Sequence, residues 1–90
     1  MSAALREALC AASQTLERLG LNCGTAGNVS VRVEGGFIIT PSGVKPGAQS
    51  AAAMVAMGLD GTVIDPRQQP SSEWRFHRDI YAARPEVGAI

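Results

Sequence analysis

The stretch VSVRVEGGFIIT, residues 29–40, limits most strongly what this 90-residue chain can fold into. Its valines alternate with Ser30 and Arg32, which is the two-residue period of a half-buried strand. The letters EGG that follow are typical of a tight turn, and FIIT then reads as the returning strand. The sequence therefore predicts a β-hairpin, which the turn residues PSG bring to an end.

A helix is predicted over residues 3–19, because apolar residues recur there at steps of three and four. The residues on this predicted apolar face are Leu5, Leu9, Ala12, Leu16 and Leu19. Ser2 is placed to cap the start of the helix. Gly20 can take the left-handed conformation that ends a helix, with Leu21 folding back onto the last turn.

Short extended segments follow the hairpin. QSAAA, residues 49–53, is expected to form a helical turn, and AMVAMGL, residues 53–59, a third strand. The pair Asp60 and Gly61 is a strong tight-turn signal, beyond which TVIDP continues as extended chain. A second helix is predicted from a cap at Ser71 or Ser72 to about Arg84, before Pro85.

The apolar face predicted for this second helix consists of Phe76, Ile80 and Ala83. EVGAI, residues 86–90, then reads as the opening of another strand. With no internal repeat and no linker, residues 1–90 are expected to form part of one α+β or α/β domain.

Charge and composition exclude several classes of protein. Eight basic and eight acidic side chains leave a formal charge of zero, and aromatic residues make up 4% of the chain. Neither the positive face nor the stacking platform of a nucleic-acid-binding protein is therefore expected. No apolar run approaches the ~18 residues of a membrane span, and the N-terminus lacks the apolar core of a signal peptide.

The two cysteines, Cys10 and Cys23, lack the spacing of a redox or metal motif. They are expected to be free thiols, which suits a reducing cytoplasm. The single lysine, Lys45, lies in a turn before a proline. Because an imine-forming lysine must be desolvated, Lys45 is not expected to be one.

Three polar clusters lie at the ends of predicted elements. GTAGN, residues 24–28, is either an anion-binding nest with donors from Thr25 and Asn28 or an ordinary turn. TPSG, residues 40–43, ends a strand, and Ser71 and Ser72 begin a helix whose free N–H groups favour negative charge. Each alone is most often a turn or a cap, but the three together suggest a shared phosphate pocket. Sequence does not show that the three ends meet.

Glu73 and His77 are four residues apart and share one face of the second helix. Glu73 is either a helix-stabilising carboxylate or a general acid–base group from which Trp74 excludes water. His77 is either a metal ligand beside Glu73 or a packed, hydrogen-bonded side chain. One histidine and two distant cysteines do not complete a zinc site of three protein ligands.

Taken together, the segments GLNCGTAGNVSVR, FIITPSG and PSSEWRFH resemble the N-terminal half of the class II aldolase/adducin family. The likeness runs from Leu19 to the end of the chain. The resemblance implies an α/β/α sandwich around a largely antiparallel sheet, here truncated, and a homotetramer in the complete protein. SSEW is similar to the aldolase branch, since the related epimerases usually carry an aspartate at the position of Glu73.

The resemblance also implies roles for individual residues. The substrate phosphate would be held by Gly27, Asn28, Ser42, Gly43, Ser71 and Ser72. Glu73 would be the catalytic acid–base and would touch the zinc in the resting enzyme. The Zn²⁺ cofactor would stabilise an enediolate while a ketose phosphate, such as L-fuculose 1-phosphate, splits into dihydroxyacetone phosphate and an aldehyde.

One departure from the family pattern limits this expectation. The family continues from a strand such as EVGAI into a His-x-His pair, with a third zinc histidine much later, and this chain stops at Ile90. All three ligand histidines are absent, so the chain alone is expected to be inactive. Ala51, Ala52 and Ala53 also stand where polar or acidic residues are common. A sugar-phosphate epimerase or dehydratase of the same family remains open, as does a non-catalytic adducin-like interaction domain.

Overall fold

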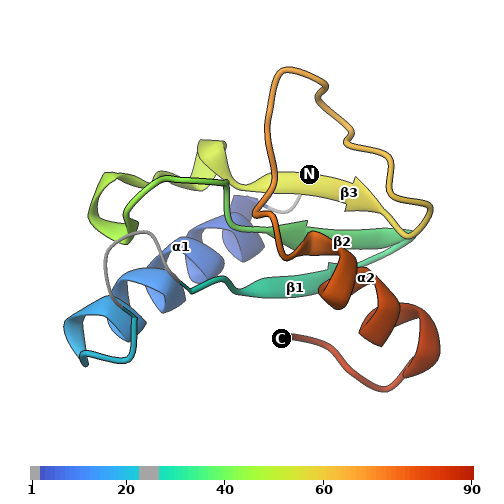
Figure 1. Ribbon diagram of the computed structural model, residues 1–90, viewed down its shortest axis with the longest axis horizontal. Helices are drawn as coiled ribbons and strands as arrows, with labels where there is room; N and C mark the ends of the chain where they lie inside the picture. The colour runs from blue at the N-terminus through green and yellow to red at the C-terminus, as the bar shows by residue number, and fades with distance from the viewer. Residues whose placement is uncertain (1–2, 23–26) are drawn as a thin grey trace.

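The structure is a computed structural model that describes residues 3–22 and 27–90 (Figure 1). Its helices and strands follow the predicted order. They are α1 (Ala3–Arg18), β1 (Ser30–Val33), β2 (Gly36–Ile39), the 3₁₀ turns η1 (Pro46–Ala48) and η2 (Ala51–Ala53), β3 (Val55–Gly58) and α2 (Trp74–Ala83). The helical turn expected within residues 49–53 is therefore confirmed as η2.

The three strands form one antiparallel sheet in the order β1-β2-β3. The predicted hairpin is confirmed and pairs Ser30 with Ile39 and Val33 with Gly36, so Gly36, which was expected in the turn, is the first residue of β2. Gly36 is required because a Cβ there would lie 1.9 Å from the carbonyl oxygen of Met57. The predicted extension after β3 is confirmed only as a single bridge between Met57 and Val63.

Residues 88–90 lie along the free edge of β1, where the C-terminus is drawn in Figure 1. The backbone N–H of Ser30 donates to the carbonyl of Ile90 at 2.8 Å, and Ile90 donates back at 3.1 Å. The bridge between Val31 and Ala89 is antiparallel. The end of the chain thus pairs like a strand, as predicted, although it forms an isolated bridge and not a full strand.

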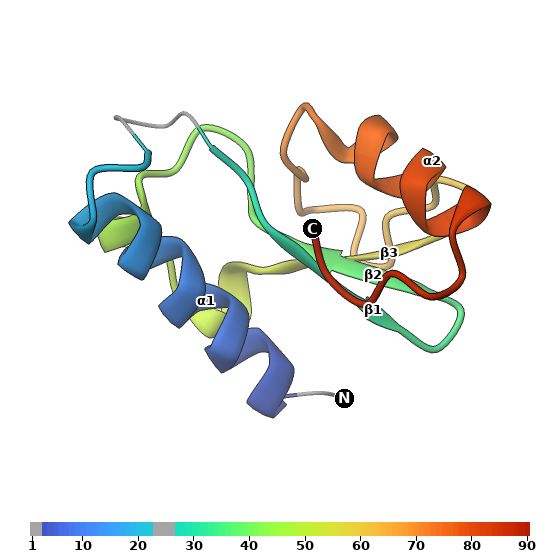
Figure 2. The same ribbon diagram turned by 90° about the horizontal axis from the view of Figure 1, so that it is seen from below.

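The sheet is the middle of three layers, with α1 on one face and α2 on the other (Figure 2). Alternate residues of β2 and β3 therefore enter different cores. Ile38 and Ala56 pack on the α1 side with Leu9, Cys10 and Met54. On the α2 side the core consists of Phe37, Ile39, Val55, Met57 and Tyr81. The expected α/β/α sandwich with an antiparallel sheet is confirmed.

The end of α1 is built as predicted. Gly20 has φ = 75°, and the N–H of Leu21 donates to the carbonyl of Leu16 at 2.9 Å. This pairing satisfies a carbonyl that the helix itself leaves open. The proposed cap at Ser2 lies outside the described residues.

The buried face of α1 differs from the predicted leucine stripe. Leu9, Cys10 and Ser13 are buried, whereas Leu5, Ala12 and Leu19 are exposed. The reason is that η1 and η2 also pack on this helix and turn its Cys10 side inward. The side-chain amide of Gln14, for example, donates to the carbonyl of Pro46 at 3.2 Å.

The predicted apolar face of α2 is wrong. Phe76 is 67% exposed, Ile80 is 40% exposed and Ala83 is exposed as well. His77 and Tyr81, which are four residues apart, are buried in their place. They can enter the interior because their polar atoms find partners there, and the Tyr81 ring packs 5.3 Å from that of Phe37.

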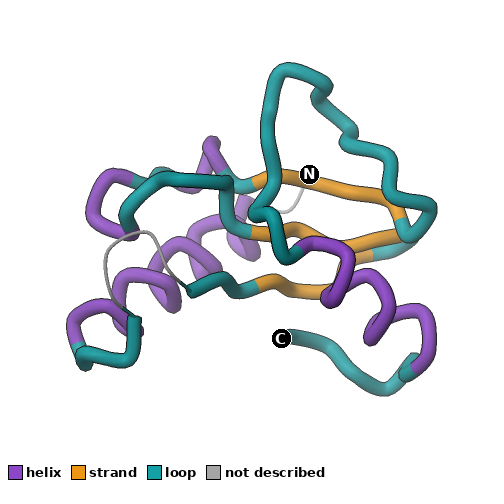
Figure 3. Tube along the Cα trace, in the orientation of Figure 1, coloured by secondary structure: helices purple, strands orange, loops and turns teal. Residues whose placement is uncertain are grey.

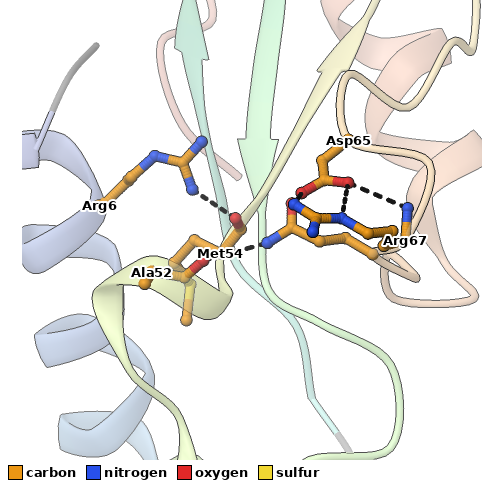
Figure 4. Close-up of polar contacts among 6 residues, drawn as sticks. Arg6, Ala52, Met54, Asp65 and Arg67 are labelled. Atoms are coloured by element: carbon orange, nitrogen blue, oxygen red, sulfur yellow. Dashed lines mark hydrogen bonds and ion pairs between the residues drawn. The ribbon is translucent and has the colours of Figure 1, made fainter.

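The long connection between β3 and α2 leaves the sheet and returns to the start of the helix (Figure 3). Two contacts shape and anchor it (Figure 4): Arg67 pairs with Asp65 at 2.9 Å, and the side chain of Gln68 donates to the carbonyl of Ala52 at 3.1 Å. Arg6 of α1 donates to the carbonyl of Met54 in the same region. Among the helices described, none is long and apolar enough to cross a membrane.

Candidate functional site

Three loops that are distant in sequence line one cavity of about 380 Å³. Its lining residues are Gly27, Asn28, Pro41, Ser42, Gly43, Ser71, Ser72 and Glu73. The residues to which the family resemblance gave phosphate-binding or acid–base roles are all among them, whereas Thr40 and His77 are not. Thr25, the other predicted donor, lies outside the described residues. The three ends that sequence alone does not connect therefore meet.

Thr40, at the end of β2, holds these loops together. Its N–H donates to the carbonyl of Val29 at 3.1 Å, and its hydroxyl accepts from the N–H of Val29 at 3.3 Å. Its own carbonyl accepts from the N–H of Ser71 at 2.9 Å. Because Thr40 is 2% exposed, these bonds are shielded from water and fix the entry of all three loops into the site.

The PSG loop lies beside the segment that precedes α2. The N–H of Ser42 donates to the carbonyl of Gln69 at 3.0 Å, and Pro41 and Pro70 form an antiparallel bridge. Gly43 has φ = 68°, in the left-handed region that favours glycine. The loop therefore turns at Gly43 with its Ser42 side still anchored.

The start of α2 forms the third wall. Glu73 occupies the N-cap position, and its N–H donates to the Ser71 hydroxyl at 3.3 Å. The prediction that Ser71 or Ser72 caps this helix is wrong, because α2 begins at Trp74 and Glu73 is its N-cap residue, without a side-chain cap hydrogen bond. The start of α2 borders the cavity through Ser71, Ser72 and Glu73, and the positive end of the helix dipole favours an anion there.

Glu73 is exposed at the cavity wall. The expectation that Trp74 excludes water from Glu73 is wrong, because the Trp74 ring lies beside Gly61, with Arg75 and Arg78 stacked over it. Glu73 is thus an open carboxylate at the edge of a polar cavity, where a bound molecule can reach it.

His77 is a packed, hydrogen-bonded side chain, which decides between the two interpretations of it. Its Nδ1 lies 2.6 Å from the hydroxyl of Ser30, and its Nε2 contacts Oδ1 of Asn28. Burial lowers the pKa of His77 below the ordinary histidine value, and the charge of Glu73 opposes this shift. With both ring nitrogens engaged, His77 is not available as a metal ligand.

The described residues do not form a zinc site. Across residues 3–22 and 27–90, no three His, Cys, Asp or Glu side chains are grouped closely enough to hold a metal ion. Cys10 is a free, buried thiol far along α1, as predicted, and Cys23 lies outside the described residues. The described walls of the cavity therefore form no metal centre by themselves.

Sequence reasoning missed two residues behind the cavity, Ser30 and Tyr81. Both are about 1% exposed and hydrogen-bonded to each other at 2.7 Å. The sequence did contain a signal for Ser30: it lies between Val29 and Val31 on a strand, so its side chain points to the face of the sheet opposite to theirs. That face is also buried, since helices cover both sides of the sheet.

Residues 7–90 match the sequence profile of the family described as Class II Aldolase and Adducin N-terminal domain. The chain is 49% identical over 87 residues to the 5-methylthioribulose-1-phosphate/5-deoxyribulose-1-phosphate aldolase of Rhodospirillum rubrum, covering 97% of this chain and 39% of that protein. It is 44% identical over 75 residues to the L-fuculose phosphate aldolase of Escherichia coli K12, covering 83% of this chain and 34% of the relative.

The fold is also similar to a solved structure of L-fuculose 1-phosphate aldolase. The TM-score is 0.92 at 31% sequence identity, and the match covers 99% of this chain and 43% of that one. The chain therefore spans less than half the length of these relatives.

Proposed function

The chain belongs to the class II aldolase and adducin family, and on that premise we propose that it is the N-terminal part of an aldolase. The proposed reaction cleaves a ketose phosphate, such as L-fuculose 1-phosphate, into dihydroxyacetone phosphate and an aldehyde. Its substrate phosphate binds in the cavity formed by the three loops. The complete enzyme is proposed to be a cytoplasmic homotetramer, as the family resemblance implies.

The observation that carries this proposal is the chemistry of the cavity wall. Hydroxyls of Ser42, Ser71 and Ser72 and the amide of Asn28 come from three loops, next to the start of α2. A phosphate monoester presents several acceptor oxygens and negative charge, and these groups supply donors together with the positive end of a helix. The cavity of about 380 Å³ is within the size range of small-molecule sites.

Glu73 is proposed as the acid–base group of the reaction. It follows Ser71 and Ser72 directly, so a phosphate held by these serines brings the neighbouring carbons of the substrate to its carboxyl group. In cleavage, the bond between C3 and C4 breaks, the C4 hydroxyl gives its proton to solvent water, and C4 becomes the aldehyde, while Glu73 later regains from water the proton that it delivers. The electron pair left on C3 is captured by a proton that Glu73 delivers.

The reaction also requires a Lewis acid to stabilise the enediolate, and the resemblance to the family implies that Zn²⁺ has this role. Because the described residues do not form a zinc site, we assign no step through zinc to them. We propose that its histidine ligands lie outside residues 3–22 and 27–90, that Glu73 touches it in the resting enzyme, and that the 90-residue chain binds phosphate but does not turn over substrate.

The first test is a titration of the ¹⁵N-labelled chain with inorganic phosphate and with dihydroxyacetone phosphate, followed by NMR. Saturable shifts confined to the three loops are expected. They should be lost in Ser71→Ala and kept in the matched variant Ser50→Ala, whose serine is exposed outside the cavity. Shifts that scatter over the surface, or that survive Ser71→Ala unchanged, would contradict the phosphate site.

The second test replaces the corresponding N-terminal segment of the Escherichia coli relative with residues 1–90 of this chain. The chimera is expected to produce dihydroxyacetone phosphate and an aldehyde from L-fuculose 1-phosphate. Glu73→Gln should abolish the product, whereas Glu34→Gln, in the exposed hairpin turn, should not. A folded chimera that only epimerises the sugar phosphate, or that retains full activity with Glu73→Gln, would overturn the proposed role.

A further inference from the structure

Four side chains form a continuous line of hydrogen bonds from the interior to the cavity wall. The hydroxyl of Tyr81 lies 2.7 Å from that of Ser30, and Ser30 lies 2.6 Å from Nδ1 of His77. Nε2 of His77 contacts Oδ1 of Asn28, which lines the cavity. Tyr81, Ser30 and His77 are at most 3% exposed, so water does not compete for these bonds.

The donor and acceptor of each hydrogen bond in this line can be assigned by starting from Asn28, at the cavity wall. A carbonyl oxygen only accepts, so Nε2 of His77 carries the ring proton and donates to Oδ1 of Asn28. In a neutral imidazole the other nitrogen is then an acceptor, and the Ser30 hydroxyl donates to Nδ1. Ser30 in turn accepts from the hydroxyl of Tyr81. The lowered pKa of His77 agrees with a neutral ring.

We propose that His77 is a positioning residue that sets which end of the Asn28 amide faces the cavity. With its carbonyl held by His77, Asn28 presents its NH₂ group, a donor, to a bound anion. The opposite amide orientation would present a carbonyl oxygen, whose partial negative charge repels an anion. The identity of that anion as a substrate phosphate rests on the proposed function, but the orientation of the amide does not.

This arrangement has a consequence for the choice of ligand. An asparagine amide offers either a donor or an acceptor with almost equal shape. The hydrogen bond from Nε2 of His77 holds the amide in its donor orientation before any ligand arrives, so the reorganisation cost of binding falls. His77 thereby contributes to selectivity for anions without touching the ligand.

The tautomer of His77 is the direct test. Long-range ¹H–¹⁵N NMR on the 90-residue chain should show Nε2 protonated and Nδ1 bare. In the same sample, the side-chain ¹⁵NH₂ signal of Asn28 should shift on titration with inorganic phosphate. A proton on Nδ1 with a bare Nε2 would mean that Asn28 donates to the ring, and this would overturn the proposal.

A double-mutant cycle provides the second readout. Asn28→Ala and His77→Phe should each weaken phosphate binding by about 10- to 100-fold, the range of one hydrogen bond to a charged group. The double variant should be no weaker than Asn28→Ala alone, because His77 acts only through Asn28. Additive losses would show that His77 merely stabilises the fold, and would contradict the proposal.

His77→Gln serves where His77→Phe does not fold, since a glutamine amide can still donate near the position of Nε2. It is expected to retain most of the phosphate affinity. An equal loss in a folded His77→Gln variant would count against the positioning role. If the unmodified chain binds no phosphate while Nε2 is protonated, the proposed function fails and the assigned orientation of Asn28 stands.

Discussion

The carbonyl oxygen of Thr40 accepts a hydrogen bond from the N–H of Ser71 at 2.9 Å, across thirty-one positions of sequence. This one contact joins the end of the central strand to the segment that enters α2. Together with the bonds between Thr40 and Val29, it explains why loops from three parts of the chain line one cavity.

Thr40→Val should therefore destabilise the protein, although the two side chains have nearly the same shape. The N–H of Val29 loses its hydroxyl partner, at a cost of about 1–3 kcal/mol in the free energy of unfolding. Urea denaturation followed by circular dichroism measures the change. Thr15→Val, on α1, is the control and should stay within about 0.5 kcal/mol. Equal losses in both variants would contradict the role given to Thr40.

Gly43→Ala should cost about 1–2 kcal/mol of stability because φ is 68° there, even though nothing lies within 4 Å of an added Cβ. Strain of the backbone is thus the only effect expected. Gly88→Ala is the matched control, since its surroundings are equally open and its φ lies outside the left-handed region. Thermal unfolding of the two variants should differ, and identical midpoints would show that the loop adapts without cost.

Arg32→Lys should destabilise the contact between β1 and the end of α2. The guanidinium donates to the carbonyls of Val87, Tyr81 and Arg84, and it stacks 4.8 Å from the centre of the Tyr81 ring. A lysine cannot reproduce this planar fork, so a loss of about 1–3 kcal/mol is expected.

The matched control for that change is Arg18→Lys at the exposed end of α1, which should be nearly neutral. Hydrogen exchange provides a local readout of the same effect. In Arg32→Lys, amide protection should fall at the C-terminal turn of α2 and in residues 87–90. Protection lost evenly over the whole chain would contradict a local role of Arg32 between β1 and the end of α2.

The stability of the chain should depend on pH through His77. Its folded pKa lies below the unfolded value of about 6.5, because burial disfavours the charged ring. Above pH 6.5 His77 is neutral in both the folded and the unfolded chain, so it makes stability no more or less dependent on pH. As pH falls through 6.5 the unfolded chain takes up a proton first, so the free energy of unfolding falls until the folded pKa is passed.

Denaturant unfolding between pH 8 and pH 5 measures this slope, and His77→Gln should remove it. The carboxyl groups with lowered pKa, those of Asp60, Asp65 and Glu86, lose their stabilising effect at lower pH, near and below about 4. The pH range of the His77 effect therefore lies above that of the carboxyl groups, and the two effects can be measured separately. A slope that persists unchanged in His77→Gln would refute the assignment.

Much of this structure could be predicted from sequence because its signals are local. The hairpin follows from valine alternation and the glycines of its turn, and the end of α1 follows from Gly20, since both depend only on neighbours along the chain. The site residues were recognisable as loops of hydroxyls and glycines at the ends of elements. Their resemblance to a family supplied the expectation that they act together.

Which face of α2 is buried depended on the tertiary structure. Apolar spacing favours Phe76 and Ile80, yet His77 and Tyr81 enter the interior because Ser30, on a distant strand, satisfies both. Trp74 likewise packs away from Glu73, beside Gly61. The sequence of the helix alone does not indicate which side chains are buried, since burial of a polar side chain is favourable only where a hydrogen-bond partner is present.

The sequence by itself thus determined the helices, the hairpin and the candidate residues, because turn chemistry and hydrophobic period act over a few residues. Tertiary structure decided that residues 27–28, 41–43 and 71–73 share one cavity, and that the Asn28 amide is held from behind. Those relationships depend on hydrogen bonds of Thr40 and His77 that cross the fold, and such partners are chosen by how the layers pack.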